Sequence, residues 1–247
     1  MEFLKMVNFE VSSVMKNKKK DVLLEYLEQS DRLIKLEDFA EFCRSKWLEP
    51  NIGLHIKNLK SGVLKGHGWC GAMPSTLHLS IQNKVREVCS GRISLSEFLE
   101  MGNNIIKHEY FIVAIADLCE WVLIKKLGAI PSIINRGVSD FAFKGIPYDL
   151  KNTSLPNGWS FGNAIKNPEK VAFSLFTGAD ILRMRKQATH PWAYNRFYVV
   201  TRTEDIWIED PEGAMKELEA SSRILEDPIK LSVDGKEVLC QVVFIDA

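Results

Sequence analysis

Two aspartates and a lysine lie close together in the stretch GVSDFAFKGIPYDLKNTSLP, residues 137–156. Their spacing is Asp140, eight residues, Asp149, one residue, Lys151. Carboxylate oxygens are preferred ligands of Mg²⁺, and a nearby ammonium group can orient an attacking water molecule or stabilise charge on a phosphate oxygen. The residue types therefore predict metal-assisted hydrolysis of a phosphate ester. The alternative is a plain Asp–Lys ion pair on a solvated face of a sheet.

A β-hairpin is expected to bring these three side chains together. The run Lys144-Gly145-Ile146-Pro147 is typical of a tight turn, with Gly145 first in a two-residue type II′ loop. Pairing of 144 with 147 places Asp140 opposite Lys151. Side chains alternate between the faces of a strand, so both aspartates share the face of the lysine. The opposite face then carries the apolar side chains of Phe141, Phe143, Tyr148 and Leu150.

The flanking sequence predicts an α/β core around this hairpin. The segment 94–128 is expected to be helical, with a capping box at 94–97 and a stop at Gly128. An interruption at Gly102-Asn103-Asn104 would leave a long apolar helix at about 104–127. Further elements follow the periodicity: strands at 129–135, 137–143 and 146–152, a helix at 168–187, a strand at 196–202 with 205–208 extending or pairing with it, a helix at 211–225 and a strand at 237–246. This order indicates a mixed central β-sheet flanked by helices.

The combination resembles the PD-(D/E)xK nuclease superfamily, over about residues 104–202. The resemblance rests on D-(x8)-D-x-K on a hairpin, after a long helix and before a crossover helix and strand. Ser139 stands where the superfamily usually has proline, and Asp149 stands where many members have glutamate. The resemblance implies a restriction-endonuclease-like core with the order α-β-β-β-α-β. It also implies a Mg²⁺ cofactor that Mn²⁺ can replace, with Asp140 and Asp149 as metal ligands and Lys151 as the catalytic lysine.

Many members of the superfamily carry a further glutamate on the helix before the hairpin. Glu109 and Glu120 are the candidates here, and their separation of eleven residues places both on the same side of a helix. We favour Glu120 as the third catalytic and metal-binding residue, because it lies in the most apolar stretch, where a charge needs a partner or a role. Glu109 stays open, as does an ion pair of Glu120 with Lys125 or Lys126.

The resemblance predicts an endonuclease that cuts double-stranded DNA, with the role of a type II restriction endonuclease. One site per chain and two strands to cut favour a homodimer. The alternatives are another nuclease of the superfamily, for repair, for a particular DNA structure or for RNA, and a non-catalytic nucleic-acid-binding protein. Residues 1–95 are interpreted as a helical N-terminal region for DNA recognition or dimerisation, and 96–247 as the nuclease core. The glycine-rich loop at 62–76 is interpreted as a mobile flap.

A group of basic and aromatic residues lies at the end of the helix predicted at 168–187 and just after it. Such a mixture suits contact with a nucleic-acid backbone, although a basic end of a helix also satisfies the helix dipole. Gln187 is a weaker candidate for reaching the metal. The group consists of Arg183, Arg185, Lys186, His190, Trp192 and Arg196.

Composition limits the class of protein. The 247 residues are 46% hydrophobic and carry 32 basic and 32 acidic side chains, which argues against a polybasic, histone-like protein. Five cysteines without a C-x-x-C pair indicate reduced thiols and a cytoplasmic protein. The N-terminus lacks a long apolar segment, so we expect no signal peptide, and no stretch is long enough to predict a membrane span.

Overall fold

The computed structural model describes residues 49–62, 64, 86–131, 139–176, 180–181, 184, 194–203 and 205–246. Its helices are α3 (Glu49–Lys60), α5 (Leu95–Leu127), α6 (Phe161–Lys166), α7 (Pro168–Leu175), α9 (Ile206–Glu209) and α10 (Pro211–Arg223). Its strands are β1 (Ile130–Pro131), β2 (Phe141–Phe143), β3 (Ile146–Ser154), β4 (Arg196–Thr201), β5 (Ile229–Val233) and β6 (Lys236–Ile245). None of the helices within these ranges has the length and apolar character needed to cross a membrane.

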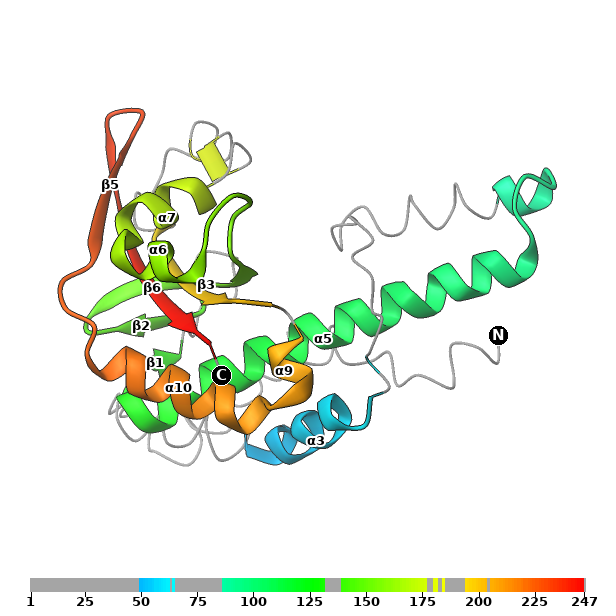
Figure 1. Cartoon of the computed structure of the whole chain (residues 1–247), viewed down its shortest axis with the longest axis horizontal. Helices are drawn as coiled ribbons and strands as arrows, with labels where there is room; N and C mark the ends of the chain where they lie inside the picture. The colour runs from blue at the N-terminus through cyan, green and yellow to red at the C-terminus, as the bar shows by residue number, and fades with distance from the viewer. Residues whose placement is uncertain are drawn as a thin grey trace, which may run out of the picture.

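Within the described ranges, six strands form one mixed sheet in the order β1-β2-β3-β4-β6-β5. Strands β1, β2 and β3 pair antiparallel, β4 lies parallel to both β3 and β6, and β5 pairs antiparallel with β6. From α5 to β4 the elements follow the predicted order of helix, three strands, helix and strand, with two helices at the crossover. The protein is thus an α/β protein with helices on both faces of a mixed sheet (Figure 1).

Helices cover the two faces of the sheet in separate groups. Leu118 of α5 and Leu218 of α10 belong to the hydrophobic cluster that contains Tyr148 and Leu150 of β3. Val171 of α7 belongs to a second cluster, which contains Tyr198 of β4. Figure 1 shows the same division, with α5 and α10 beneath the sheet and α6 and α7 above it. Since side chains alternate along β3, Asp149 and Lys151 face the side of α6 and α7.

Helix α5 begins at the predicted capping box and ends at the predicted glycine, but it runs without the predicted interruption. Ser94 and Glu97 form the predicted capping box, and Gly128 ends the helix in the left-handed conformation with φ 71°. The helix continues through Gly102-Asn103-Asn104, so the predicted interruption was wrong. Its 33 residues span about 50 Å at 1.5 Å per residue. Figure 1 shows its N-terminal half extending beyond the sheet. The weak helix formers glycine and asparagine at 102–104 lie in this half and do not break the helix.

The β2–β3 hairpin keeps the predicted faces with a different turn. Phe143 pairs with Ile146, which makes Lys144 and Gly145 the two-residue loop. Both have positive φ, 49° and 78°, which is the geometry of a type I′ turn rather than the predicted type II′ turn. The pairing therefore differs from the prediction by two residues, and a shift of two leaves every side chain on its predicted face.

Near the C-terminus the structure differs from the sequence prediction at two further points. The run 205–208 was expected to extend or pair with the preceding strand, but Ile206–Glu209 forms the short helix α9. Strand β5 was not predicted at all. Its hairpin with β6 turns at Asp234 and Gly235, both with positive φ, and Asp-Gly is a strong sequence signal for such a turn.

Candidate active site

The carboxylate of Asp140 is fixed to the neighbouring strand β3. Asp140 lies just before β2, and its backbone N–H donates to the carbonyl of Tyr148 at 2.8 Å. Its Oδ2 accepts the backbone N–H of Leu150 at 2.7 Å. That N–H belongs to the peptide that joins Asp149 to Leu150. The Asp140 carboxylate therefore lies beside the Asp149–Leu150 peptide of β3, although nine positions separate the two acids in the sequence.

Asp149 is held between two cations. The Nζ of Lys151 lies 2.9 Å from Oδ1 and 2.7 Å from Oδ2 of Asp149. The Nη1 of Arg196 lies 3.3 Å from the same Oδ2. The parallel register explains the second contact, because Asp149 pairs with Arg196 across β3 and β4. Both oxygens of this carboxylate thus point into a positively charged environment.

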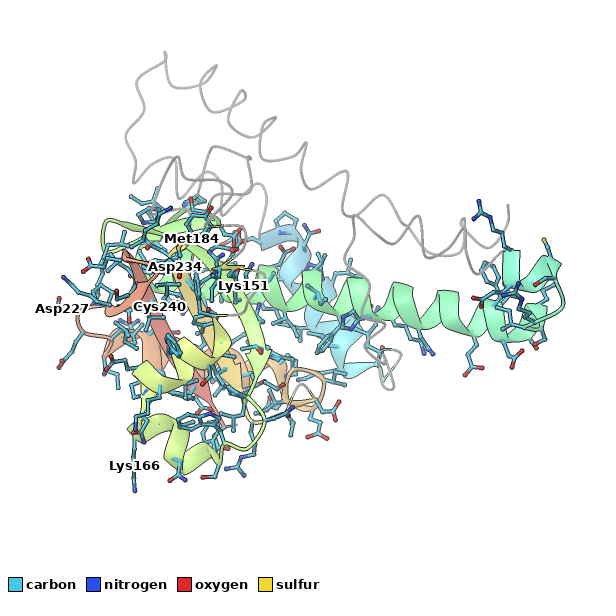
Figure 2. The ribbon with its side chains drawn as sticks, turned by 90° about the horizontal axis from the view of Figure 1, so that it is seen from above. Lys151, Lys166, Met184, Asp227, Asp234 and Cys240 are labelled. Carbon is cyan, nitrogen blue, oxygen red and sulfur yellow. The ribbon has the colours of Figure 1, made fainter. Side chains whose placement is uncertain are left out.

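The two cations differ in their access to solvent. The side chain of Lys151 is 41% exposed, whereas that of Arg196 is 3% exposed. Figure 2 labels Lys151 in the central part of the molecule, whereas Lys166 and Asp227 lie at its periphery. Lys151 can therefore reach a molecule that approaches from solvent, and Arg196 is enclosed by the protein.

Asn195 fixes the backbone beside Asp149. Its carbonyl accepts the N–H of Asp149 at 3.1 Å, and its side-chain amide donates to the carbonyl of Pro147 at 3.1 Å. Its Oδ1 accepts the N–H of Leu239 on β6 at 3.0 Å. One buried residue thus ties the starts of three neighbouring strands together. Sequence reasoning did not single out Asn195.

Glu120, the predicted helix-borne acid, is buried on α5 at 6% exposure. Its neighbour Cys119 donates to Oδ1 of Asn152 on β3 at 3.2 Å, which places this part of α5 against the strand. Burial, together with the charge of Glu120, raises the pKa of the Cys119 thiol well above its usual value. Asn152 alternates with Asp149 and Lys151 along β3, so it lies on the opposite face of the sheet. Glu109 lies within α5 as predicted.

No three His, Cys, Asp or Glu side chains of the described residues gather closely enough to hold one metal ion together. Asp140, Asp149 and Glu120 therefore do not form a three-ligand group. Asp140 and Asp149 remain a pair of hard oxygen donors. Mg²⁺ is usually held by one or two carboxylates, with waters and substrate phosphate as the other ligands. The donor chemistry of this pair fits such an ion.

The predicted basic and aromatic group is only partly described. Arg183, Arg185, Lys186, Gln187, His190 and Trp192 lie outside the described residues, as does most of the loop at 62–76. Arg196 was expected to contact nucleic acid, but its burial removes it from such a role. The sequence could not predict that Arg196 is buried, because its partner Asp180 is sixteen residues away and no local pattern links the two residues.

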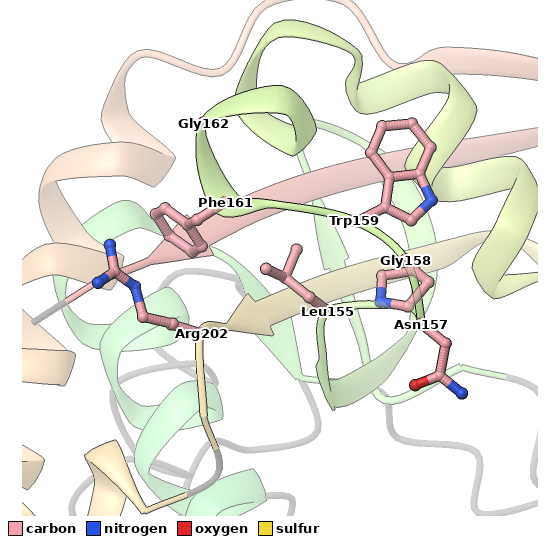
Figure 3. Close-up of a pocket in the computed structure, with 8 residues that line it drawn as sticks. Leu155, Asn157, Gly158, Trp159, Phe161, Gly162 and Arg202 are labelled. Atoms are coloured by element: carbon pink, nitrogen blue, oxygen red, sulfur yellow. The ribbon is translucent and has the colours of Figure 1, made fainter.

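A pocket of about 520 Å³ lies at the carboxyl ends of β3 and β4 (Figure 3). Trp159 and Phe161 line it, together with Leu155, which follows β3 and packs with the cluster beneath α6 and α7. The guanidinium of Arg202 lies 5.2 Å from the centre of the Phe161 ring and pairs with Asp246 at 2.6 Å. Aromatic faces beside a guanidinium suit stacking of nucleic-acid bases. Sequence reasoning missed this pocket.

Comparison of the chain with models of protein families, with curated proteins and with solved structures finds no match.

Proposed function

We propose that this protein is a Mg²⁺-dependent endonuclease that hydrolyses phosphodiester bonds of double-stranded DNA. The observation that carries the proposal is the arrangement of the hairpin charges. The Asp140 carboxylate is bonded to the N–H of Leu150, and the Lys151 ammonium lies 2.7 Å from Asp149. Two carboxylates and a partly exposed ammonium thereby meet around two consecutive residues of one strand. Carboxylates that can hold a cation, beside an ammonium that can stabilise charge on a phosphate, suit metal-assisted phosphodiester hydrolysis.

Asp140 and Asp149 would hold the divalent cation, and Mn²⁺ would substitute for Mg²⁺. A bound Mg²⁺ supplies Lewis-acid charge that stabilises negative oxygens in the transition state. The hydrogen bond from Leu150 orients the Asp140 carboxylate before any ligand arrives. Glu120, the acid predicted on α5, is left out of this cation site, because α5 packs against the opposite face of the sheet from Asp149 and Lys151.

Lys151 is the residue that we expect to contact the attacking water and the scissile phosphate. Its ammonium would orient the attacking water and stabilise charge on the oxygens of the scissile phosphate. Its exposure of 41% allows contact with a phosphodiester at the surface. Its two contacts with Asp149 hold the ammonium beside the carboxylate that would carry the cation. Substrate and cation would therefore meet at one point.

The order of elements supports a restriction-endonuclease-like core. Helix α5, the antiparallel strands β1 to β3, the helices α6 and α7 and the parallel strand β4 follow the α-β-β-β-α-β order of the PD-(D/E)xK superfamily. We further propose sequence-specific restriction as the biological role and a two-fold homodimer as the active form, since each chain supplies one site. The pocket lined by Trp159, Phe161 and Arg202 would contact nucleotides next to the scissile bond.

One observation favours a second candidate function. Lys151 and Arg196 both bind Asp149, which is also what a structural ion-pair network requires. In that case the protein would bind nucleic acid, or another partner, without catalysis. Cation binding by the intact chain separates the two functions.

A metal titration monitored by thermal unfolding tests the proposal. A cation at 100 times its Kd stabilises the folded state by about 2.7 kcal/mol. For a chain of this size that is a rise in Tm of roughly 5–10 °C. We expect this rise with Mg²⁺ or Mn²⁺ for the natural protein and its loss in Asp149→Asn. Equal Tm values with and without cation would contradict the proposed function.

A further inference from the structure

Arg196 is a buried arginine that connects three parts of the fold. Its Nη1 lies 3.3 Å from Oδ2 of Asp149 on β3, and its Nη2 donates to Oδ1 of Asp180 at 2.8 Å. Asp180 lies beyond the end of α7, and its side chain is 14% exposed. The guanidinium carbon lies 5.8 Å from the centre of the Phe176 ring. One side chain therefore joins β4 to Asp149 and to the segment of Asp180.

The guanidinium stays charged in this environment. Burial alone would lower its pKa, but Asp149 and Asp180 together raise the pKa of Arg196 above its ordinary value. A planar guanidinium presents its N–H groups in a fixed fork, so two carboxylates bound to its two ends are fixed relative to each other. A lysine ammonium is a single point of charge on a flexible stem and does not impose this geometry.

Lys151 and Arg196 contact Asp149 from different sides. Lys151 approaches the Asp149 carboxylate from the partly exposed side, at the end of a flexible side chain. Arg196 approaches from inside the protein, at 3% exposure, and is held by Asp180 as well. Substitution of a group that hydrogen-bonds to a metal ligand and orients it typically lowers metal affinity by about 10–100-fold.

We propose that Arg196 is a positioning residue, which holds the Asp149 carboxylate in place for a divalent cation and is itself held by Asp180. This inference rests on the proposed function and deepens it. The site would then depend on a residue that touches neither substrate nor cation. The segment around Asp180 would also influence cation binding, although it lies outside the hairpin that carries the two acids.

The test is Mn²⁺ binding to the intact chain, measured by calorimetry without DNA. Arg196→Lys keeps the positive charge and removes the planar fork, so we expect a Kd about 10-fold weaker or more. Arg223→Lys is the matched control, because Arg223 also pairs with an acidic residue, Glu219, but it lies on α10, on the other face of the sheet, at 56% exposure. Its Mn²⁺ affinity should stay within twofold of that of the natural protein.

Asp180→Asn provides a second variant should Arg196→Lys fail to fold. Asparagine keeps an oxygen that accepts the hydrogen bond from Arg196, but it lacks the charge. We expect a loss of Mn²⁺ affinity of a few-fold in Asp180→Asn. An unchanged Kd in a folded Arg196→Lys or Asp180→Asn protein would overturn the inference.

A double substitution shows whether Arg196 acts through Asp149. In Asp149→Asn the carboxylate charge is gone, so adding Arg196→Lys should weaken residual Mn²⁺ binding by less than it does in the natural protein. Fully additive losses would overturn the positioning role and leave the proposed function intact. Absence of Mn²⁺ binding by the natural protein would overturn both.

Discussion

Leu150 donates its backbone N–H to the carboxylate of Asp140 at 2.7 Å. The same carboxylate therefore supports the hairpin and, in the proposed function, would also bind the cation. A structural role and a catalytic role of Asp140 predict different outcomes for two substitutions, because asparagine preserves the acceptor and alanine does not.

We expect Asp140→Asn to fold with a stability within about 1 kcal/mol of the natural protein and to lose Mg²⁺ binding. Asp140→Ala should lose Mg²⁺ binding too. In addition, its free energy of unfolding should fall by about 1–3 kcal/mol, because the N–H of Leu150 would be left without its acceptor. Urea unfolding and calorimetric titration with Mg²⁺ measure the two effects. Mg²⁺ affinity unchanged in Asp140→Asn would remove Asp140 from the metal site.

The type I′ turn of the β2–β3 hairpin predicts a stabilising substitution. Lys144 adopts φ 49°, a left-handed conformation that asparagine tolerates better than lysine. Lys144→Asn should therefore raise the free energy of unfolding by a few tenths of a kcal/mol or more, despite loss of the hydrogen bond from Lys144 to the carbonyl of Leu225. Gly145→Ala, at φ 78°, should lower it by about 1 kcal/mol. Urea unfolding checks both, and stabilisation by Gly145→Ala would contradict the turn assignment.

The hairpin also shows what the sequence could predict and what it could not. Alternation of polar and apolar residues is a property of neighbouring residues, so it predicted the faces of Asp149 and Lys151 even though the pairing was misassigned by two. The turn was misassigned because lysine with positive φ is uncommon. The run Ile206–Glu209 is too short for periodicity to distinguish a helix from a strand. The contact of Arg196 with Asp180 depends on tertiary packing, which local pattern does not encode.

A buried hydrogen-bond network fastens α3 to α5. The Nε2 of His55 lies 3.0 Å from Oδ2 of Asp117, and its Nδ1 lies 3.0 Å from the hydroxyl of Tyr110. His55→Ala should lower the free energy of unfolding by about 2–4 kcal/mol, because it leaves a cavity and removes a partner of a buried carboxylate. Arg223→Ala, which breaks an exposed pair with Glu219, is the control and should cost less than about 1 kcal/mol. Equal losses in the two variants would contradict the structural role of this network.

The N-terminal cap of α5 predicts a dependence on pH. Hydrogen bonds from the backbone and side chain of Ser94 lower the pKa of Glu97. A carboxyl with a lowered pKa in the folded state stabilises the fold above its unfolded pKa, and this stabilisation disappears as the pH falls through the folded value. The stability difference between the natural protein and Glu97→Gln should therefore shrink on going from pH 6 to pH 3. A difference that grows in acid would contradict the capping box.

Cleavage of DNA by the natural protein and by Lys151→Ala shows whether the hairpin charges form a nuclease site. Mixed plasmid and phage DNA would be incubated with each protein and Mg²⁺, and the products separated by size. Because Lys151 is partly exposed, Lys151→Ala should keep the fold, which unfolding in urea verifies. We expect discrete fragments from the natural protein and a loss of at least about 100-fold in cleavage rate for Lys151→Ala. Equal cleavage by both proteins, or no cleavage of DNA by the natural protein, would contradict the proposed nuclease function.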